Sequence, residues 1–284
     1  MADRDERRVQ AAKHLALMKG ALASETAATV AAAVIYEDGE GRELPLPEAA
    51  FESTETSVTT AFAPAALRDA VGKTAVVDPT AFTRPGGGYE DGAFGPEQIL
   101  CSESNLYPIL CGLKDAYHDG NRGYQRGQLF TDRALYLPDV VFSHDGTIRK
   151  ADVIAIPEPN RARALENHRS ERECDRCLAE RIEAILRITA ANGCETLICG
   201  AFGCGREGFD PQQVIGLFKD WIEAHPGAIG RIVFAVPRAH ASAFDEALGK
   251  PTVEEVASAI VDEDEDEDSF DVRDVELPEG VTLR

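Results

Sequence analysis

The stretch TAVVDPTAFTRPGGG, residues 74–88, indicates the fold class of this 284-residue chain. A short β-branched run at 74–78 ends in an acid and a proline, which is how a buried strand delivers the chain to a functional loop. The next loop is rich in glycine, and the helix expected after it begins at Pro96, because proline favours the first turn of a helix. A strand, a glycine loop and a helix in this order indicate an α/β protein.

The same order recurs further along the chain. Apolar runs at 151–157 (ADVIAIP) and 196–199 (TLIC) each lead into a loop, and RIVFAVP at 231–237 predicts the last core strand. Helices are expected at about 4–33 and 171–192, so strands alternate with helices over most of the chain. The sequence therefore predicts an α/β fold with a largely parallel or mixed sheet.

Three segments carry more local predictions. Residues 33–44 (AVIYEDGEGREL) predict a strand, a turn at Asp38-Gly39 and a returning strand. A single helix is expected from about 96 to 118, and YLPDVVFS at 136–143 predicts an edge strand or a hairpin arm.

The net charge of −21 is unevenly placed. Residues 251–284 hold 13 acidic side chains and two arginines, so the remainder carries a moderate −10. We therefore expect one domain at 1–250, including a helical extension at 1–33, and a solvated, mostly disordered acidic tail, with an interaction tail as the alternative. The charge argues against direct binding to nucleic acid but leaves room for a local basic pocket for a small anion.

The seven cysteines are an odd number, and the charged N-terminus does not resemble a secretory signal. Reduced thiols in a cytoplasmic protein are expected. Cys174 and Cys177 form a CxxC pattern, but a zinc site would need a second pair and only His168 lies nearby, so two cysteines on one helical turn is the favoured interpretation and no metal is expected. No apolar run approaches the roughly 18 residues of a membrane helix, so a membrane-spanning protein is not expected.

Two glycine-rich loops are the strongest chemical signal. Gly86-Gly87-Gly88 comes after the strand that ends at Asp78, and GAFGCGREG at 200–208 comes after TLIC. Glycine lets a backbone approach a ligand and point successive N–H groups at it, while the next helix adds its positive end. Because the carboxyl ends of parallel strands meet at one edge of a sheet, the loops would form a clamp for a diphosphate. The alternative is that both loops are turns without a ligand.

Two other phosphate motifs do not fit. Residues 203–208 satisfy G-x-G-x-x-G, but a dinucleotide site needs an acid about 20 residues later at the end of a second strand. The strand at 231–237 ends in proline without such an acid, and neither glycine loop carries the Gly-Lys-Ser/Thr of a P-loop.

The residues around the first loop resemble the signature of the microbial-type poly(ADP-ribose) glycohydrolases, a branch of the macrodomain fold. That family has a glycine triplet, a short spacer, Gln-Glu-Glu, and then Leu-Cys and Ser-x-Leu-Tyr. Here 86–88 matches the triplet, while Leu100-Cys101 and Asn105-Leu106-Tyr107 match the last two motifs. The second loop is similar to the family's pyrophosphate loop, and ADVIAIPEPN to the strand and Pro-Asn loop between them. The resemblance covers about 8–247 and implies a three-layer fold with helices on both faces of the sheet.

The resemblance implies a site for ADP-ribose or an ADP-ribosylated protein, with no cofactor. Gly86, Gly87 and Gly88 would face the distal ribose and the diphosphate. Asp78 stands where the family usually has an asparagine near the distal ribose. The diphosphate would be cradled by Phe202, Gly203, Cys204, Gly205 and Arg206.

The family's catalytic acid is absent from its usual place. An alignment without gaps sets residues 96–98 (PEQ) on Gln-Glu-Glu, in which the first glutamate binds ribose hydroxyls and the second is the general acid and base. Gln98 can hydrogen-bond but cannot cycle a proton, and general acid–base catalysis is worth about 10²–10⁴-fold in rate. Glu97 is therefore the candidate surviving acid. Other acids nearby are Glu90, Asp91 and Glu103.

Three functions stay open from the sequence. The chain is an ADP-ribose glycohydrolase acting on poly- or mono-ADP-ribosyl substrates, an ADP-ribose-binding domain that has lost hydrolysis, or a protein for another nucleotide-derived ligand. Gln98 separates the first two, because Gln98→Glu should raise hydrolysis strongly in an otherwise competent fold. A different nucleotide that outcompetes ADP-ribose would indicate the third.

Overall fold

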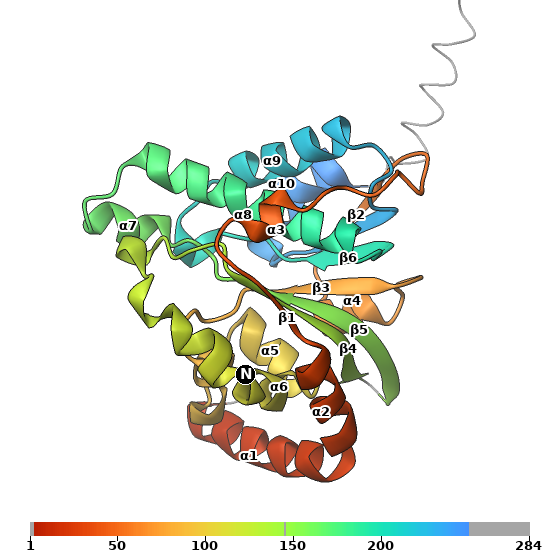
Figure 1. Ribbon diagram of the computed structural model, residues 1–284, viewed down its shortest axis with the longest axis vertical. Helices are drawn as coiled ribbons and strands as arrows, with labels where there is room; N and C mark the ends of the chain where they lie inside the picture. The colour runs from red at the N-terminus through yellow and green to blue at the C-terminus, as the bar shows by residue number, and fades with distance from the viewer. Residues whose placement is uncertain (1–2, 145, 250–284) are drawn as a thin grey trace, which may run out of the picture. The chain divides into compact units, whose positions relative to one another are not determined.

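A seven-stranded sheet forms the middle layer of the computed structural model, which describes residues 3–144 and 146–249 (Figure 1). The strand order is β1-β4-β5-β3-β6-β7-β2. The predicted acidic tail lies outside the described residues, so the division into domain and tail stays a prediction. The strands are β1 (Val34–Tyr36), β2 (Glu55–Thr59), β3 (Thr74–Asp78), β4 (Ala134–His144), β5 (Thr147–Ala155), β6 (Thr196–Cys199) and β7 (Arg231–Ala235).

Five neighbouring strands of the sheet are parallel. β3 pairs in parallel with both β5 and β6, β6 pairs in parallel with β7, and β7 with β2. Only β4 runs against its neighbours β1 and β5. The carboxyl ends of five strands therefore meet at one edge, and the predicted α/β class with a largely parallel sheet is confirmed.

Helices cover both faces of the sheet, which gives the three layers (Figure 1). The first face packs on α1 (Arg4–Ala21), α2 (Ala23–Ala32), α4 (Ala63–Leu67), α5 (Pro96–Ser102) and α6 (Leu106–Gly112). The second packs on α7 (Arg161–Glu166), α8 (Glu171–Ala191), α9 (Pro211–Ala224) and α10 (Arg238–Leu248), with α3 (Glu40–Glu43) lying against α8. Short helical turns are η1 (Pro85–Asp91), η2 (Lys114–His118), η3 (Gly120–Gly123), η4 (Arg126–Gln128) and η5 (Gly205–Glu207).

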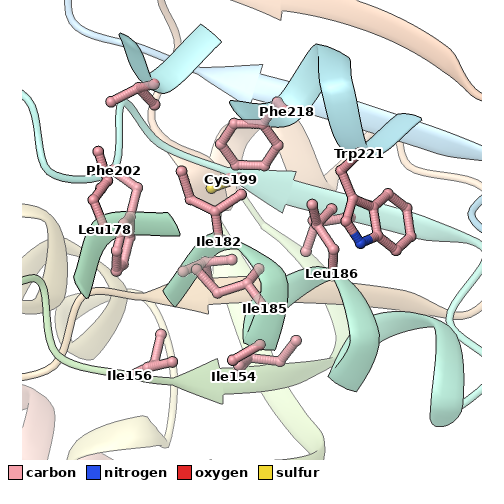
Figure 2. Close-up of a cluster of buried hydrophobic side chains, with 14 of the residues drawn as sticks. Ile154, Ile156, Leu178, Ile182, Ile185, Leu186, Cys199, Phe202, Phe218 and Trp221 are labelled. Carbon is pink, nitrogen blue, oxygen red and sulfur yellow. The ribbon is translucent and has the colours of Figure 1, made fainter. Parts of the chain in front are cut away.

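Side chains of the central strands alternate between two hydrophobic cores. In β3, Ala75 and Val77 join the core under α8, whereas Val76 joins the core under α5 and α6. This alternation is a consequence of the two-residue period of a strand. Figure 2 shows Ile182 and Ile185 of α8 within the first of these cores, together with residues of β5 and α9. Because both faces of the central strands are buried, these strands are held firmly in place, and so are the strand ends from which the loops emerge.

The predicted returning strand after Asp38-Gly39 is wrong, because α3 stands in its place. Gly39 takes a left-handed conformation (φ 93°) and the chain then turns helically. Gly41 lies so close to α8 that a Cβ there would come within 2.9 Å of Ile188 Cδ1. We therefore attribute the helical conformation of residues 40–43 to close packing against α8, which is remote in sequence.

The helix predicted for 96–118 is interrupted between α5 and α6. Ser104 Oγ donates to the Leu100 carbonyl at 2.6 Å, and the amide of Val141 donates to Asn105 Oδ1 at 2.9 Å. These bonds tie the break to β4, because Val141 belongs to that strand. β4 itself is a hairpin arm paired with β5, and β1 rather than β4 takes the edge of the sheet.

Candidate active site

A cavity of about 840 Å³ opens at the carboxyl edge of the parallel strands. Its volume lies within the range of about 300–1,000 Å³ that is usual for small-molecule sites. Both glycine-rich loops contribute to its wall, as the sequence predicts. The cavity is lined by residues just beyond the strand ends: Thr60 after β2, Thr80 after β3, Glu158 after β5, Gly200 after β6 and Val236 after β7.

The first loop is shaped by the protein's own side chains. Gly86, Gly87 and Gly88 have φ values of 63°, 53° and 94°, a region that favours glycine. A Cβ on Gly86 would lie 2.4 Å from the ring of Tyr107, and one on Gly87 would lie 2.6 Å from Glu97 Oε2. Of the three glycines, Gly87 reaches the cavity wall. The triplet therefore lets the chain pass directly over the Glu97 carboxylate.

Glu97 is a buried carboxyl held in one orientation. Its side chain lines the cavity and the residue is 4% exposed. Thr80 Oγ1 donates to Oε1 at 2.9 Å, and the Ala81 amide donates to Oε2 at 3.1 Å. Burial raises the pKa of Glu97 to about 7, against the lowering effect of these two donors. Such a carboxyl can hold and release a proton near neutral pH, which is the property of a general acid.

Asp78 lies at the end of β3 and is completely buried. Burial, together with the nearby Glu97, raises the pKa of Asp78 well above its usual range. A carboxyl in this state keeps its proton and can donate a hydrogen bond, as the amide of an asparagine does. Asp78 does not itself line the cavity, although its neighbours Val77 and Pro79 do.

Gln98 joins α5 to the first loop. Its Nε2 donates to the carbonyl of Gly86 at 3.0 Å, and the residue lines the cavity next to Glu97. The amide therefore stabilises the glycine triplet but offers no proton for transfer. Glu97 and Gln98, which the alignment sets on the family's two glutamates, thus stand side by side in the cavity wall.

The second loop differs because its glycines alternate with other residues. Gly203, Gly205 and Gly208 have φ values of 80°, 74° and 89°. A Cβ on Gly205 would meet only His240 Nε2, at 4.0 Å, so the space above this glycine is open. The loop residues that line the cavity include Phe202, Cys204, Gly205 and Arg206, whereas Gly203 does not line it.

Two side chains of this loop anchor it to the core. Phe202 is 2% exposed and belongs to the same hydrophobic core as Leu178 of α8 (Figure 2). Burial raises the pKa of the Cys204 thiol to about 12, so this sulfur is not a nucleophile at neutral pH. After the loop, α9 begins at Pro211, and Asp210 Oδ1 accepts from the Gln212 amide at 2.8 Å as its cap.

Glu158 is a cavity residue that the sequence interpretation missed. Its Oε1 accepts from the amide of Gly203 at 2.7 Å, and burial together with Glu207 raises its pKa to about 8. An acid between two prolines, directly after the apolar strand 151–157, is the signal that could have identified it.

The loop that carries Glu158 rests on a buried arginine. Arg181 of α8 is 1% exposed and donates to the carbonyls of Pro157, at 3.1 Å, and Leu129, at 2.8 Å. These contacts span 24 and 52 residues of sequence, so no local pattern could have predicted them.

The other acids considered near the first loop do not line the cavity. Asp91 pairs with Arg84, Glu103 Oε2 lies 3.1 Å from His144 Nδ1, and Glu90 is exposed. Cys174 and Cys177 are buried in α8, and no cluster within 3–144 and 146–249 has the residues for a metal ion. Over the same residues, no helix is long and apolar enough to cross a membrane.

The fold and the segment that holds the first loop have counterparts in known proteins. Residues 8–145 match the model of the microbial-type PARG catalytic domain. A poly(ADP-ribose) glycohydrolase from Thermomonospora curvata, bound to the inhibitor ADP-HPD, is 26% identical with a TM-score of 0.74, over 86% of this chain and 99% of that chain. The Deinococcus radiodurans enzyme in complex with ADP-ribose is 26% identical with a TM-score of 0.70, over 78% of this chain and 96% of that chain. No protein with curated annotation matches the sequence.

The three-layer α/β fold is thus macrodomain-like, as in the PARG structures. The family match at residues 8–145 and the similarity to bacterial PARG structures together support a PARG-like family for this chain.

Proposed function

We propose that the cavity binds ADP-ribose, free or attached to a protein. The observation that carries the proposal is the convergence of the two glycine loops on one cavity of nucleotide size, in a fold shared with an ADP-ribose complex. In this proposal Gly87 lies at the distal ribose, with Asp78 buried beside the cavity wall, and the loop from Phe202 to Arg206 holds the diphosphate. A backbone rich in N–H groups at positive φ suits an anion.

We further propose that Glu97 supports slow hydrolysis of the glycosidic bond. Its proton would pass to the leaving oxygen as the bond to the anomeric carbon breaks. The resulting carboxylate would then take a proton from the water that attacks this carbon, which restores the acid. The raised pKa of Glu97 and its fixed orientation between Thr80 and Ala81 support this role.

The second candidate function is binding of ADP-ribose without turnover. It is favoured by Gln98, whose amide bonds to the Gly86 carbonyl and supplies no proton where the family has its catalytic acid. The same cavity would then act as a reader of ADP-ribosylated proteins.

One experiment separates these candidates. Release of ADP-ribose from poly(ADP-ribose) and from a mono-ADP-ribosylated protein is measured for the wild type and Glu97→Gln, with ADP-ribose binding measured in parallel. For a hydrolase, Glu97→Gln should lower release by about 10²-fold or more while ADP-ribose still binds. Binding without release by the wild type would establish the second candidate, and failure to bind ADP-ribose would refute both.

A further inference from the structure

The second loop already holds a carboxyl group of the protein itself. Gly203 donates its amide to Glu158 Oε1 at 2.7 Å, and both the Glu158 side chain and the loop belong to the cavity wall. Backbone N–H groups of a loop with alternating positive φ values are the groups that would receive a diphosphate. The Glu158 carboxyl group therefore already occupies one of the backbone N–H groups of the proposed diphosphate site.

The titratable groups near Glu158 come from three elements, η5, β3 and β6, and from Cys204 at the start of η5. Glu207 and Arg206 lie in η5, with opposite effects on its ionisation, and Asp78 reaches it from β3. The thiols of Cys199 and Cys204 are also close enough to interact with its charge, and both are protonated. Burial is the largest influence, Glu207 adds to it, and together they raise the pKa of Glu158 to about 8. At neutral pH the group is mostly a neutral acid, with an O–H that can donate to an anion.

We propose that Glu158 is a specificity-determining residue for the charge of the ligand. As a neutral acid it shares the second loop with a diphosphate, because it accepts from Gly203 and can donate to a phosphate oxygen. As a carboxylate it excludes a diphosphate from the same loop by repulsion. The inference rests on the proposed binding of ADP-ribose and adds the condition under which that binding occurs.

This role predicts an effect opposite to that of an ordinary contact residue. Glu158→Gln keeps an oxygen that can accept from the Gly203 amide, supplies an N–H donor and never carries charge. The variant should therefore bind ADP-ribose more tightly than the wild type at high pH. A residue that only supports the loop would show weaker binding on substitution at every pH.

The test is calorimetric titration of ADP-ribose into the wild type and Glu158→Gln at pH 6.5 and 9.0. The diphosphate diester of ADP-ribose keeps the same charge over this range. Glu223→Gln is the matched control, because this exposed acid on α9 does not line the cavity. Thermal unfolding of each variant checks that it is folded.

We expect the two proteins to bind within about threefold of each other at pH 6.5, since Glu158 is then mostly neutral. Between pH 6.5 and 9.0 the wild-type affinity should fall about tenfold, whereas that of Glu158→Gln should change by less than about threefold. Glu223→Gln should behave as the wild type does. Binding by Glu158→Gln alone would also support the proposal.

Two results would overturn it. An equal fall in affinity for the wild type and Glu158→Gln, or weaker binding by the variant at both pH values, would refute the role of Glu158 and leave ADP-ribose binding intact. No binding of ADP-ribose by any folded variant at either pH would refute the proposed function and this inference together.

Discussion

The two glycine loops reach the same cavity but use glycine for different reasons. In the first loop the space beside the backbone is filled, since a Cβ on Gly86 or Gly87 would overlap Tyr107 or Glu97. In the second loop a Cβ on Gly205 would have only His240 within 4.0 Å, so at this glycine the restriction is the left-handed backbone and the space is open, whereas a Cβ on Gly203 would lie 3.0 Å from Leu178. The first loop thus serves the packing of the acid, and the second leaves room for a ligand.

This difference indicates how the work of the site is divided. The first loop lies over Glu97 and is bonded by Gln98, so changes there should alter chemistry and stability together. The second loop presents backbone groups and donates to the acid Glu158, so changes there should alter binding first. Substitutions in each loop, and changes of pH, can therefore test the division.

The strongest response should come from Gln98→Glu at the first loop. The change restores a group that can donate and accept a proton beside Glu97, so we expect release of ADP-ribose to rise by about 10²–10⁴-fold. The measurement is the initial rate of release from poly(ADP-ribose). Gln128→Glu, which adds the same charge to another part of the cavity wall, is the control and should give no gain. Retained binding with no gain from Gln98→Glu would refute the assignment of residue 98 to the catalytic position.

Alanine at Gly87 and at Gly205 should separate the two loops directly. Gly87→Ala combines a strained φ with overlap on Glu97 Oε2, so we expect it to lower the free energy of unfolding by about 2–4 kcal/mol. Gly205→Ala should cost about 1 kcal/mol, because only the backbone is strained, yet it should weaken ADP-ribose binding at least about tenfold by filling ligand space. Urea unfolding and calorimetry measure both. Equal losses of stability in Gly87→Ala and Gly205→Ala would contradict the claim that the first loop serves packing and the second serves ligand binding.

Stability should fall as pH rises, because the cavity acids hold their protons more tightly in the folded state. Glu97 and Glu158 have folded pKa values of about 7 and 8, above those of unfolded glutamate. The folded state therefore binds more protons than the unfolded state over this range, and raising the pH removes that advantage. His118, with a folded pKa of about 4, contributes in the opposite direction but only below pH 6.5.

Between pH 6.5 and 8.5 we expect the free energy of unfolding to drop by about 1–3 kcal/mol. Urea unfolding at both pH values measures it, and Glu97→Gln and Glu158→Gln should each remove part of the drop. A stability that increases over this interval, or that changes equally in both variants and the wild type, would show that the two carboxyls are not protonated in the fold.

Cys204→Ser in the second loop should have little effect. The thiol is protonated and buried, so it supplies packing rather than charge or nucleophilicity. We expect the affinity for ADP-ribose to change by less than about threefold. Calorimetry at pH 7 measures this, and loss of binding in a folded Cys204→Ser protein would indicate a direct role of the sulfur.

Local patterns were sufficient to predict the elements that frame the cavity. The run at 74–78 is a strand buried on both faces, and the loops at 86–88 and 200–208 emerge from the same sheet edge because their strands are parallel. The motif spacing also aligned Glu97 and Gln98 with the family's two glutamates, and the structure sets both side chains next to Gly87. Hydrophobic periodicity and the conformational preferences of glycine depend on only a few neighbouring residues, so both can be recognised in the sequence alone.

Long-range contacts determine the features that local patterns did not predict. Residues 40–43 form a helix because Gly41 packs against α8, and the helix after Pro96 breaks where Asn105 bonds to β4. Burial from several elements gives Glu158 its altered ionisation, and Arg181 holds the preceding Pro157 from a distant helix. The partners in these contacts are far apart in sequence, and only the folded sheet brings them together.

Calorimetric titration of the wild type with ADP-ribose at pH 6.5, with AMP and ADP as controls, tests whether the two loops share one ligand. Binding with a Kd on the order of micromolar that weakens when the distal ribose is missing is the predicted result, because both loops then contact one ligand. Equal binding of AMP, ADP and ADP-ribose, or no binding by a folded protein, would contradict the claim that the two glycine loops form one ADP-ribose site.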